Sequence, residues 1–467
     1  MEYSYYRERW SALMKDTAVD PDRLERLARQ VAHSFLDYYL KDCRYEEEYI
    51  DLLCEMTTFS WDPKLANPPT GALFGIIIES LCDDFEELQT VTYNKVMAQV
   101  ISHCRNIPAG RELDAALRDF GIHSSKDILD RVNTVRSNSN CLSGQKKVRK
   151  VILLSRVTIG ADVAITSIVI QRLNKIFPEA EFVLIGGGKL QELFGENPRI
   201  RIRRIQYSRN GGVLERLSSW HSVLEIIQQE MRSCPVEETI LVDPDSRFSQ
   251  LGILPIFPNE RYFFFDSRSD SALNKKMSMS ELTNSWLDKV TGEEGFCYPK
   301  VWIPQPYLDL SKEFCKGLRS QGARRIIVAN FGVGGNPRKR VGRHLEEGIL
   351  ISLLQEANTV VLLDKGLGDE ELAYTNSLVN AIDKQGYAVL HTSLDSQGSA
   401  LIGWGLIGIE SRIGEVAALI AECDEFIGYD SACQHIAAAL LTPCLTIFAG
   451  SNNMRFIRRW SAYGRKS

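Results

Sequence analysis

The chain has 467 residues, of which 44% are hydrophobic and 25% are charged, as in ordinary soluble globular proteins. Its net charge of −5 excludes a general nucleic-acid binder. Eleven scattered cysteines form no C-x-x-C pair, which argues against a disulfide framework or a zinc site and favours free thiols in a reducing compartment.

Residues 1–135 carry helical signals. They begin MEYSYYRERW, which has charges but no apolar core of a signal peptide, so we expect a cytoplasmic protein. The stretch Asp20–Leu40 opens with a candidate Asp cap followed by Pro, and its apolar residues recur at helical spacing. Glu86–His103 and Arg111–Phe120 show the same pattern. The polar stretch 136–150, RSNSNCLSGQKKVRK, is typical of a linker.

From residue 151 onward, apolar runs alternate with helical patterns. This βαβα order predicts two tandem halves of about 150 residues, each with a parallel sheet covered on both faces, and a ligand-binding cleft between them. The expected strands are Val151–Leu154, Phe182–Ile185, Ile200–Ile205, Thr239–Val242 and Tyr262–Phe265, then Ile326–Asn330, Val360–Asp364, Ala388–His391, Phe426–Tyr429 and Cys444–Phe448.

The run Ser431–Met454 contains no Asp, Glu, Lys or Arg and is long enough to span a bilayer, which takes about 20 residues. Gln434 and His435 would be costly in hydrocarbon, and Pro443 would break the span. We interpret the region as a strand–helix–strand unit with Asp430 at the junction of strand and helix. That edge of an α/β sheet binds ligands, and a helix start favours an anion.

Asp162 follows Gly160 at a strand-to-helix turn. One interpretation is a structural acid in the first helical turn, where a carboxylate stabilises the helix by about 0.3–1 kcal/mol. The alternative is a general base that faces the cleft.

The stretch NFGVGGNPRKRVGRHL, residues 330–345, places a glycine-rich turn and three cations after a strand. Backbone approach and positive charge together suit a diphosphate. The chain has no GxxxxGK[ST] loop, and no GxGxxG motif opens a helix at the first strand, so ATPase and dinucleotide-binding functions are disfavoured.

These stretches together resemble glycosyltransferase family 9, the ADP-heptose–lipopolysaccharide heptosyltransferases. The resemblance covers about residues 148–467 and leaves residues 1–135 outside. The sequence departs from the family where Ala161 separates the G-D pair and where Ala432 replaces the signature glycine. The similar segments are GADVAITSIVIQRLNKIFPEAEFVLIGG, NFGVGGNPRKR, TVVLLDKGLGDEELA, EVAALIAECDEFIGYDSACQHIAAALLTPCLTIFAG and WSAYG.

The resemblance implies an α/β fold of GT-B type, with two Rossmann-like domains that face a cleft. The helical pattern of residues 1–135 adds an all-helical N-terminal domain before them. The domains would be 1–135 (helical), 136–150 (linker), 151–310 (acceptor side) and 311–467 (nucleotide-sugar binding). It implies inverting sugar transfer without a metal or other cofactor, with Asp162 as the base. The donor-binding residues would be Arg338, Lys339, Asp430, Ser431, Ala432, Cys433 and His435.

The implied donor is a nucleotide-diphospho-sugar similar to ADP-heptose, and the acceptor a glycan, lipid or protein hydroxyl. No transmembrane segment is expected, which leaves peripheral membrane contact open. Two alternatives remain: a non-catalytic sugar-nucleotide-binding protein with a helical partner-docking module, and a GT-B-like nucleotide-sugar epimerase. We also expect the helical domain to dock near the first α/β half and to shape its acceptor side.

Overall fold

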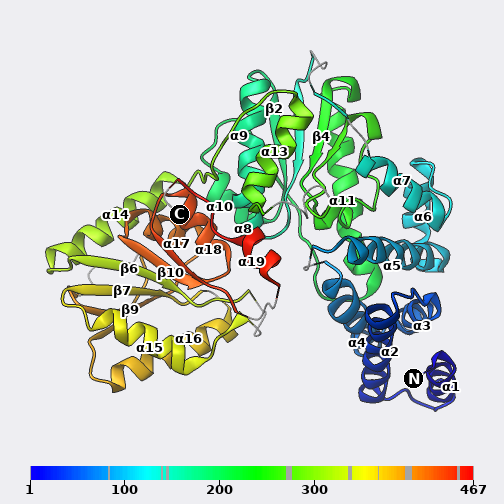
Figure 1. Ribbon diagram of the computed structural model, residues 1–467, viewed down its shortest axis with the longest axis horizontal. Helices are drawn as coiled ribbons and strands as arrows, with labels where there is room; N and C mark the ends of the chain where they lie inside the picture. Colours follow the sequence, from blue (N-terminus) through cyan, green and yellow to red (C-terminus); the bar gives the residue numbers. More distant parts are fainter. Residues whose placement is uncertain are drawn as a thin grey trace. The chain divides into compact units, whose positions relative to one another are not determined.

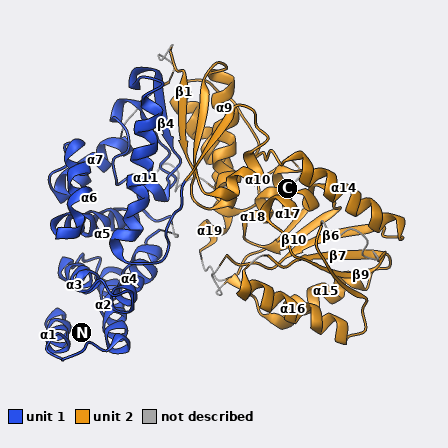
Figure 2. Cartoon of the chain, turned by 180° about the vertical axis from the view of Figure 1, so that it is seen from behind, with its two compact units in different colours: residues 1–140, 205–275 blue, residues 141–204, 276–467 orange. Residues whose placement is uncertain are grey.

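The computed structural model describes residues 2–82, 85–137, 140–142, 147–269, 276–334, 339–366, 368–394, 402–449 and 453–465. The chain forms two compact units, which Figure 2 distinguishes by colour. Unit 1 comprises residues 1–140 and 205–275, and unit 2 comprises residues 141–204 and 276–467.

The N-terminal part of unit 1 is helical, as expected. Helix α2 (Pro21–Asp42) begins where the sequence predicts, because the Asp20 side chain accepts a hydrogen bond from the N–H of Asp22 and Pro21 takes the first helical position. Leu24 and Phe35 lie on its buried face. The other helical segments are α1 (Tyr3–Leu13), α3 (Glu47–Thr58), α4 (Pro63–Ala72), η1 (Leu73–Ile78), α5 (Glu87–Asn106), η2 (Pro108–Gly110), α6 (Arg111–Asp119) and α7 (Ser125–Ser137).

This helical block packs against residues 205–275 within unit 1, as expected for docking on the first α/β half. The Tyr93 hydroxyl on α5 donates to the carbonyl of Gln250 at 3.3 Å. The Arg131 guanidinium on α7 donates to the carbonyl of Gly252 at 2.9 Å. Buried side chains therefore tie the block to the loop that follows a strand of the first sheet.

The first sheet has five strands in the order β3-β2-β1-β4-β5, and its paired strands β1–β2, β2–β3 and β4–β5 run parallel. All five predicted strands are confirmed within one or two residues. Their bounds are β1 (Lys150–Leu154), β2 (Glu181–Gly186), β3 (Ile200–Arg204), β4 (Thr239–Asp243) and β5 (Tyr262–Phe264).

The helix that follows β1 contains a wide, π-helical turn at η3 (Asp162–Thr166), between α8 (Ile159–Ala161) and α9 (Ser167–Ile176). Such turns are rare and are frequently found at functional sites. The other helical segments of this half are η4 (Gly188–Leu190), α10 (Gln191–Phe194), α11 (Val213–Met231), η5 (Val236–Glu238), η6 (Arg247–Ser249), η7 (Asn259–Arg261) and α13 (Met279–Thr291).

The second sheet lies wholly in unit 2 and has six parallel strands in the order β11-β10-β6-β7-β9-β8. Five of them were predicted, and β9 was not. Their bounds are β6 (Arg325–Asn330), β7 (Thr359–Asp364), β8 (Val389–Thr392), β9 (Gly405–Ile409), β10 (Glu425–Tyr429) and β11 (Cys444–Ile447).

Helices cover both faces of the second sheet (Figure 1). On one face, Leu350 and Leu354 of α15 join Leu378 and Ile382 of α16 in a core with the strands. The other face carries α14, α17 and α18. The carboxyl ends of the parallel strands therefore form one edge between two helical layers, where ligands of such sheets bind. The helices are α14 (Gln305–Ser320), α15 (Arg343–Leu354), α16 (Asp369–Lys384), α17 (Ile413–Glu422), α18 (Ala432–Ala439) and α19 (Met454–Trp460).

The apolar run at residues 431–454 is part of this sheet, as the strand–helix–strand interpretation predicted. It contains α18 and β11, and β11 pairs with β10 in parallel. Within the described ranges, no helix is both long and apolar enough to cross a lipid bilayer.

Candidate active site

Polar side chains gather at the carboxyl edge of the second sheet. Asp364, the last residue of β7, accepts hydrogen bonds from Asn330 Nδ2 at 2.6 Å and from Ser411 Oγ at 2.7 Å. Burial raises the pKa of its carboxyl. Lys365 pairs with Glu410 at 2.9 Å beside it. Three strand ends thus share one polar cluster, which sequence analysis did not single out.

The predicted donor residues Lys339 and Asp430 meet at the same edge. The Lys339 ammonium donates to Asp430 Oδ2 at 2.9 Å and to the Asp430 carbonyl at 3.0 Å. The lysine side chain is 27% exposed and the aspartate side chain 10%. An ammonium has three N–H groups, so one remains for a ligand.

The neighbouring cation Arg340 makes other contacts. Arg340 lies over the ring of Tyr374, 3.7 Å from its centroid, and donates to the Phe331 carbonyl at 3.2 Å. It therefore holds the loop rather than pairing with Asp430. Arg338, the other predicted donor residue, lies outside the described residues.

Ser431 is the N-cap residue of α18 and is extended, with φ −150° and ψ −175°. Its hydroxyl is buried and has no hydrogen-bond partner among the described residues. Ala432 and Cys433 form the first turn, and burial holds the pKa of the Cys433 thiol well above its usual range. Burial also lowers the pKa of the His435 imidazole to about 4. The thiol and the imidazole are therefore neutral at pH 7, and neither supplies charge to an anion.

Asp162 is fully buried and accepts three hydrogen bonds from its own turn. Its donors are Ser155 Oγ at 2.7 Å, the backbone N–H of Arg156 at 2.9 Å and Thr166 Oγ1 at 2.8 Å. Burial raises the pKa of its carboxyl to about 6, partly offset by these bonds. The surroundings are those of a structural acid, whereas a pKa near neutrality suits a general base. Its catalytic role stays a prediction.

The turn before Asp162 is strained. Val157 has φ +76°, a region that a β-branched residue rarely enters. Its N–H donates to Ser155 Oγ at 2.9 Å, and that hydroxyl donates to Asp162. Asp162 and Ser155 therefore hold this backbone in place.

The structure brings the Asp162 turn and the Asp430 junction together within unit 2. A Cβ atom built on Gly160 would lie 3.2 Å from the Cα of Ala432 and 3.0 Å from His435 Cδ2. Two motifs about 270 residues apart in the sequence thus lie in direct contact. A side chain at position 160 would crowd this contact.

The C-terminal segment after β11 also contributes. Gln434 Nε2 donates to Asp430 Oδ1 at 2.8 Å and to the carbonyl of Trp460 at 3.0 Å. The Trp460 ring lies near His435 and carries Arg156 over its face, 5.7 Å from the centroid. Trp460 belongs to a segment similar to the family, but no role was predicted for Trp460, Gln434 or Arg156. The i, i+4 spacing of Asp430 and Gln434 is the one signal that could have suggested their contact.

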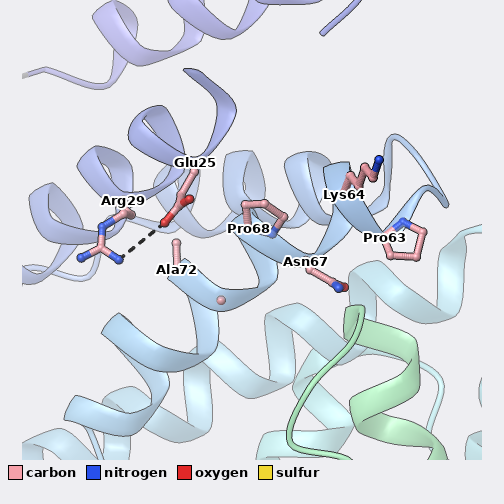
Figure 3. A pocket seen from close by; sticks show the side chains of 8 residues that line it. Glu25, Arg29, Pro63, Lys64, Asn67, Pro68 and Ala72 are labelled. Atoms are coloured by element: carbon pink, nitrogen blue, oxygen red, sulfur yellow. Dashed lines mark ion pairs between the residues drawn. The ribbon is translucent and has the colours of Figure 1, made fainter. Parts of the chain in front are cut away.

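A pocket of about 400 Å³ lies in unit 1 between α2 and α4 and contains no predicted site residue (Figure 3). Glu25 and Arg29 form an ion pair of 3.9 Å at its edge, across from Lys64. In the ranges that the structure describes, no group of three or more His, Cys, Asp and Glu side chains is arranged to hold a metal ion.

Residues 406–466 match the sequence model of glycosyltransferase family 9 (heptosyltransferase). The matched part contains β10, α18 and α19 and therefore Asp430, Gln434 and Trp460. The resemblance to glycosyltransferase family 9 is confirmed. The expected class of enzyme, a glycosyltransferase, is confirmed with it. No curated protein matches the sequence significantly.

Several solved structures of glycosyltransferases are similar to this chain. The crystal structure of a glycosyltransferase family 9 protein from Veillonella parvula has a TM-score of 0.50 and 15% identity, covering 68% of this chain and 85% of that one. ADP-heptose lipopolysaccharide heptosyltransferase II from E. coli has a TM-score of 0.41 and 14% identity, covering 66% of this chain and 88% of that one. E. coli heptosyltransferase WaaC with ADP has a TM-score of 0.42 and 11% identity, covering 68% of this chain and 91% of that one. The Veillonella likeness confirms the expected GT-B type of α/β fold.

Proposed function

We propose that the chain is an inverting, metal-independent glycosyltransferase. It would move a sugar, with heptose as first candidate, from a nucleotide-diphospho-sugar to a hydroxyl of a glycan, lipid or protein. One observation carries this proposal: the start of α18, with the Lys339–Asp430 pair, lies directly against the turn that leads to Asp162. Donor-binding and proton-accepting groups are therefore neighbours within one compact unit.

The proposal assigns a separate role to each part of the chain. The first sheet belongs to an acceptor-side domain of residues 151–310, and the second to a nucleotide-sugar-binding domain of residues 311–467. Residues 1–135 form the helical domain and residues 136–150 the linker. The packing of the helical block on residues 205–275 supports a role on the acceptor side.

The donor diphosphate binds at the start of α18. Lys339 and Arg338 supply positive charge, and the N–H groups of the first turn, from Ser431 to Cys433, point toward the anion. Asp430 accepts from a hydroxyl group of the donor. His435 contributes a neutral side chain that packs beside Gly160. Cationic side chains and helix N–H groups thus stabilise the charge that develops on the leaving diphosphate.

In the transfer step, the acceptor oxygen forms a bond to the anomeric carbon of the sugar from the face opposite the diphosphate. The bond between that carbon and the diphosphate oxygen breaks, and its electron pair leaves with the nucleoside diphosphate. The proton of the acceptor hydroxyl passes to the carboxylate of Asp162. Because Asp162 is fully buried, the strained turn of residues 156–161 must move before an acceptor reaches it.

The burial of Asp162 also favours a second candidate function, sugar-nucleotide binding without turnover. The two functions share the donor site and differ in their products. Incubation with the donor that binds, with and without glycan acceptors, separates them through release of nucleoside diphosphate.

Donor binding tests the proposal first. ADP, GDP, UDP and their sugars are titrated calorimetrically into the wild type and into Lys339→Ala and Arg338→Ala. Loss of one charged hydrogen bond should weaken binding of the preferred donor by about 10- to 150-fold, equivalent to about 1.5–3 kcal/mol. Lys316→Ala, which removes the same charge from the exposed surface of α14, should leave the affinity unchanged. Two results would refute this assignment: a wild type that binds no nucleotide, or site variants that both bind the donor with the affinity of the wild type.

A further inference from the structure

Gln434 is a fully buried glutamine in the first turn of α18. Its Nε2 donates to two oxygen atoms, Asp430 Oδ1 at 2.8 Å and the Trp460 carbonyl at 3.0 Å. Both partners are acceptors, so the orientation of the amide is fixed: nitrogen faces them and Oε1 points elsewhere. The side chain therefore folds back from its own turn toward the junction of β10 and α18.

The Gln434 amide is the second side chain that donates a hydrogen bond to the Asp430 carboxylate. Lys339 holds Oδ2 at 2.9 Å while Gln434 holds Oδ1, so both carboxylate oxygens have a donor. Charge-assisted hydrogen bonds are stronger and shorter than neutral ones, so such a carboxylate has one preferred orientation.

The same two side chains reach the C-terminal helix. Gln434 binds the backbone at Trp460, the last residue of α19, and the Lys339 ammonium lies 5.9 Å from the ring centre of Phe456 on that helix. Helix α19 and the start of α18 are therefore connected through the groups that hold Asp430.

Two buried polar atoms in this first turn have no partner among the described residues: Gln434 Oε1 and the Ser431 hydroxyl. A buried carbonyl oxygen without a donor destabilises the fold. Nearby Gly160 covers this turn against Ala432. Hydroxyl groups of a bound sugar nucleotide would supply the missing donors once that cover moves, which marks the turn as a ligand site and not only a packing contact.

We propose that Gln434 is a positioning residue of the donor site, a role that rests on the proposed function. Its amide orients the Asp430 carboxylate for the donor and keeps α19 against α18, while its own carbonyl is left to accept a donor hydroxyl. The ligand class is a nucleotide-diphospho-sugar.

The test replaces the amide at nearly constant volume. Gln434→Met keeps a long unbranched side chain and loses both hydrogen bonds. Donor affinity should fall about tenfold or more, the loss expected for one charged hydrogen bond, and KM for the donor should rise with little change in kcat. Gln171→Met is the matched control, because Gln171 Nε2 likewise bonds a backbone carbonyl, that of Tyr298 at 2.8 Å, away from the donor edge. This control should bind donor as the wild type does.

A second variant keeps the proposal testable if Gln434→Met does not fold. Gln434→Glu retains size and reach but sets a carboxylate beside Asp430 Oδ1. Donor binding relative to wild type should be weaker at pH 8 than at pH 5, where a protonated glutamic acid donates again. A merely structural role predicts no such pH dependence of affinity.

The possible outcomes distinguish failure of the positioning role of Gln434 from failure of the proposed function on which it rests. If the wild type binds a sugar nucleotide and whichever Gln434 variant folds binds it equally at both pH values, the positioning role is overturned and the donor site stands. If the wild type binds none of the nucleotides tested, the proposed function fails, and the inference fails with it.

Discussion

Replacing Asp162 by asparagine separates the cost of burying a charge from a role in catalysis. The side chain has no exposed surface, and burial raises the pKa of its carboxyl from an ordinary 3.8 to about 6. Because this pKa is higher in the folded protein, the stabilising contribution is fully present below about pH 4 and is lost as pH rises through about 6. A shift of about two units corresponds to about 3 kcal/mol at neutral pH.

Asparagine carries no charge and keeps the shape of the side chain. Its oxygen can accept from the Arg156 N–H and from Thr166, and its amide group can donate to Ser155 Oγ, which rotates its own proton away. The variant should therefore fold without the pH-dependent cost. Relative to wild type, its free energy of unfolding should rise by about 2–3 kcal/mol between pH 4 and pH 8.

Urea unfolding at several pH values between 4 and 8 measures this difference. Asp243→Asn in unit 1 is the matched control, since Asp243 is also fully buried and burial raises its pKa to about 6. Both variants should show the same pH trend in stability. Only Asp162→Asn should lower sugar transfer, by at least about 100-fold, while its donor affinity stays normal.

Two results would refute parts of this reasoning. A stability difference that does not change between pH 4 and pH 8 would mean that the Asp162 carboxyl is not buried as an ionisable group. Near-normal transfer by Asp162→Asn, with the expected pH trend, would assign the residue to structure alone.

Two further substitutions test how the site is held. Gly160→Ala should lower the free energy of unfolding by about 1–3 kcal/mol, because its Cβ would crowd Ala432. Gly187→Ala is the control and should leave the free energy of unfolding unchanged, because a Cβ there would meet no atom within 4 Å. Equal unfolding curves for both variants would contradict the close approach of Gly160 to Ala432. Arg131→Met should destabilise unit 1 by about 1–3 kcal/mol, because the Gly252 carbonyl loses its donor. Calorimetric donor affinity should stay unchanged in Arg131→Met, and a tenfold loss would show that the donor site depends on the helical block.

Most strands were predictable because a buried parallel strand is a short apolar run with turn residues at its ends. Strand β9 was missed because its sequence, GLIGI, contains two glycines, which weaken a strand pattern. The neighbours β7 and β8 supply its hydrogen bonds, so the sheet decides the conformation. Position 408 also has a close neighbour from outside the strand, because a Cβ there would lie 3.1 Å from Lys365 Cδ.

The sequence predicted several residues of the candidate site but not the contacts between them. Motif spacing indicated Asp430 and Lys339 separately, since each follows a strand, but their ion pair joins residues 91 positions apart. Asp162 was visible as an acid after a glycine, whereas its burial depends on Ser155 and Thr166, whose hydroxyls look ordinary in sequence. For Gln434 the sequence offered only the i, i+4 spacing to Asp430, and its second partner, the Trp460 carbonyl, lies 26 residues further along the chain.

If the proposed donor site is correct, the charges at the start of α18 decide how a diphosphate would bind there. The imidazole and thiol of that turn are neutral at pH 7, and Lys339 and Asp430 satisfy each other in the free protein. An arriving diphosphate competes with Asp430 for the ammonium. A hydroxyl of the donor can take the place of the ammonium on Asp430 Oδ2, while Gln434 keeps Oδ1 in position. Hydrogen-bond donors would then hold both oxygens of the Asp430 carboxylate after the ammonium has moved to the diphosphate, which reduces the cost of separating a partly buried ion pair.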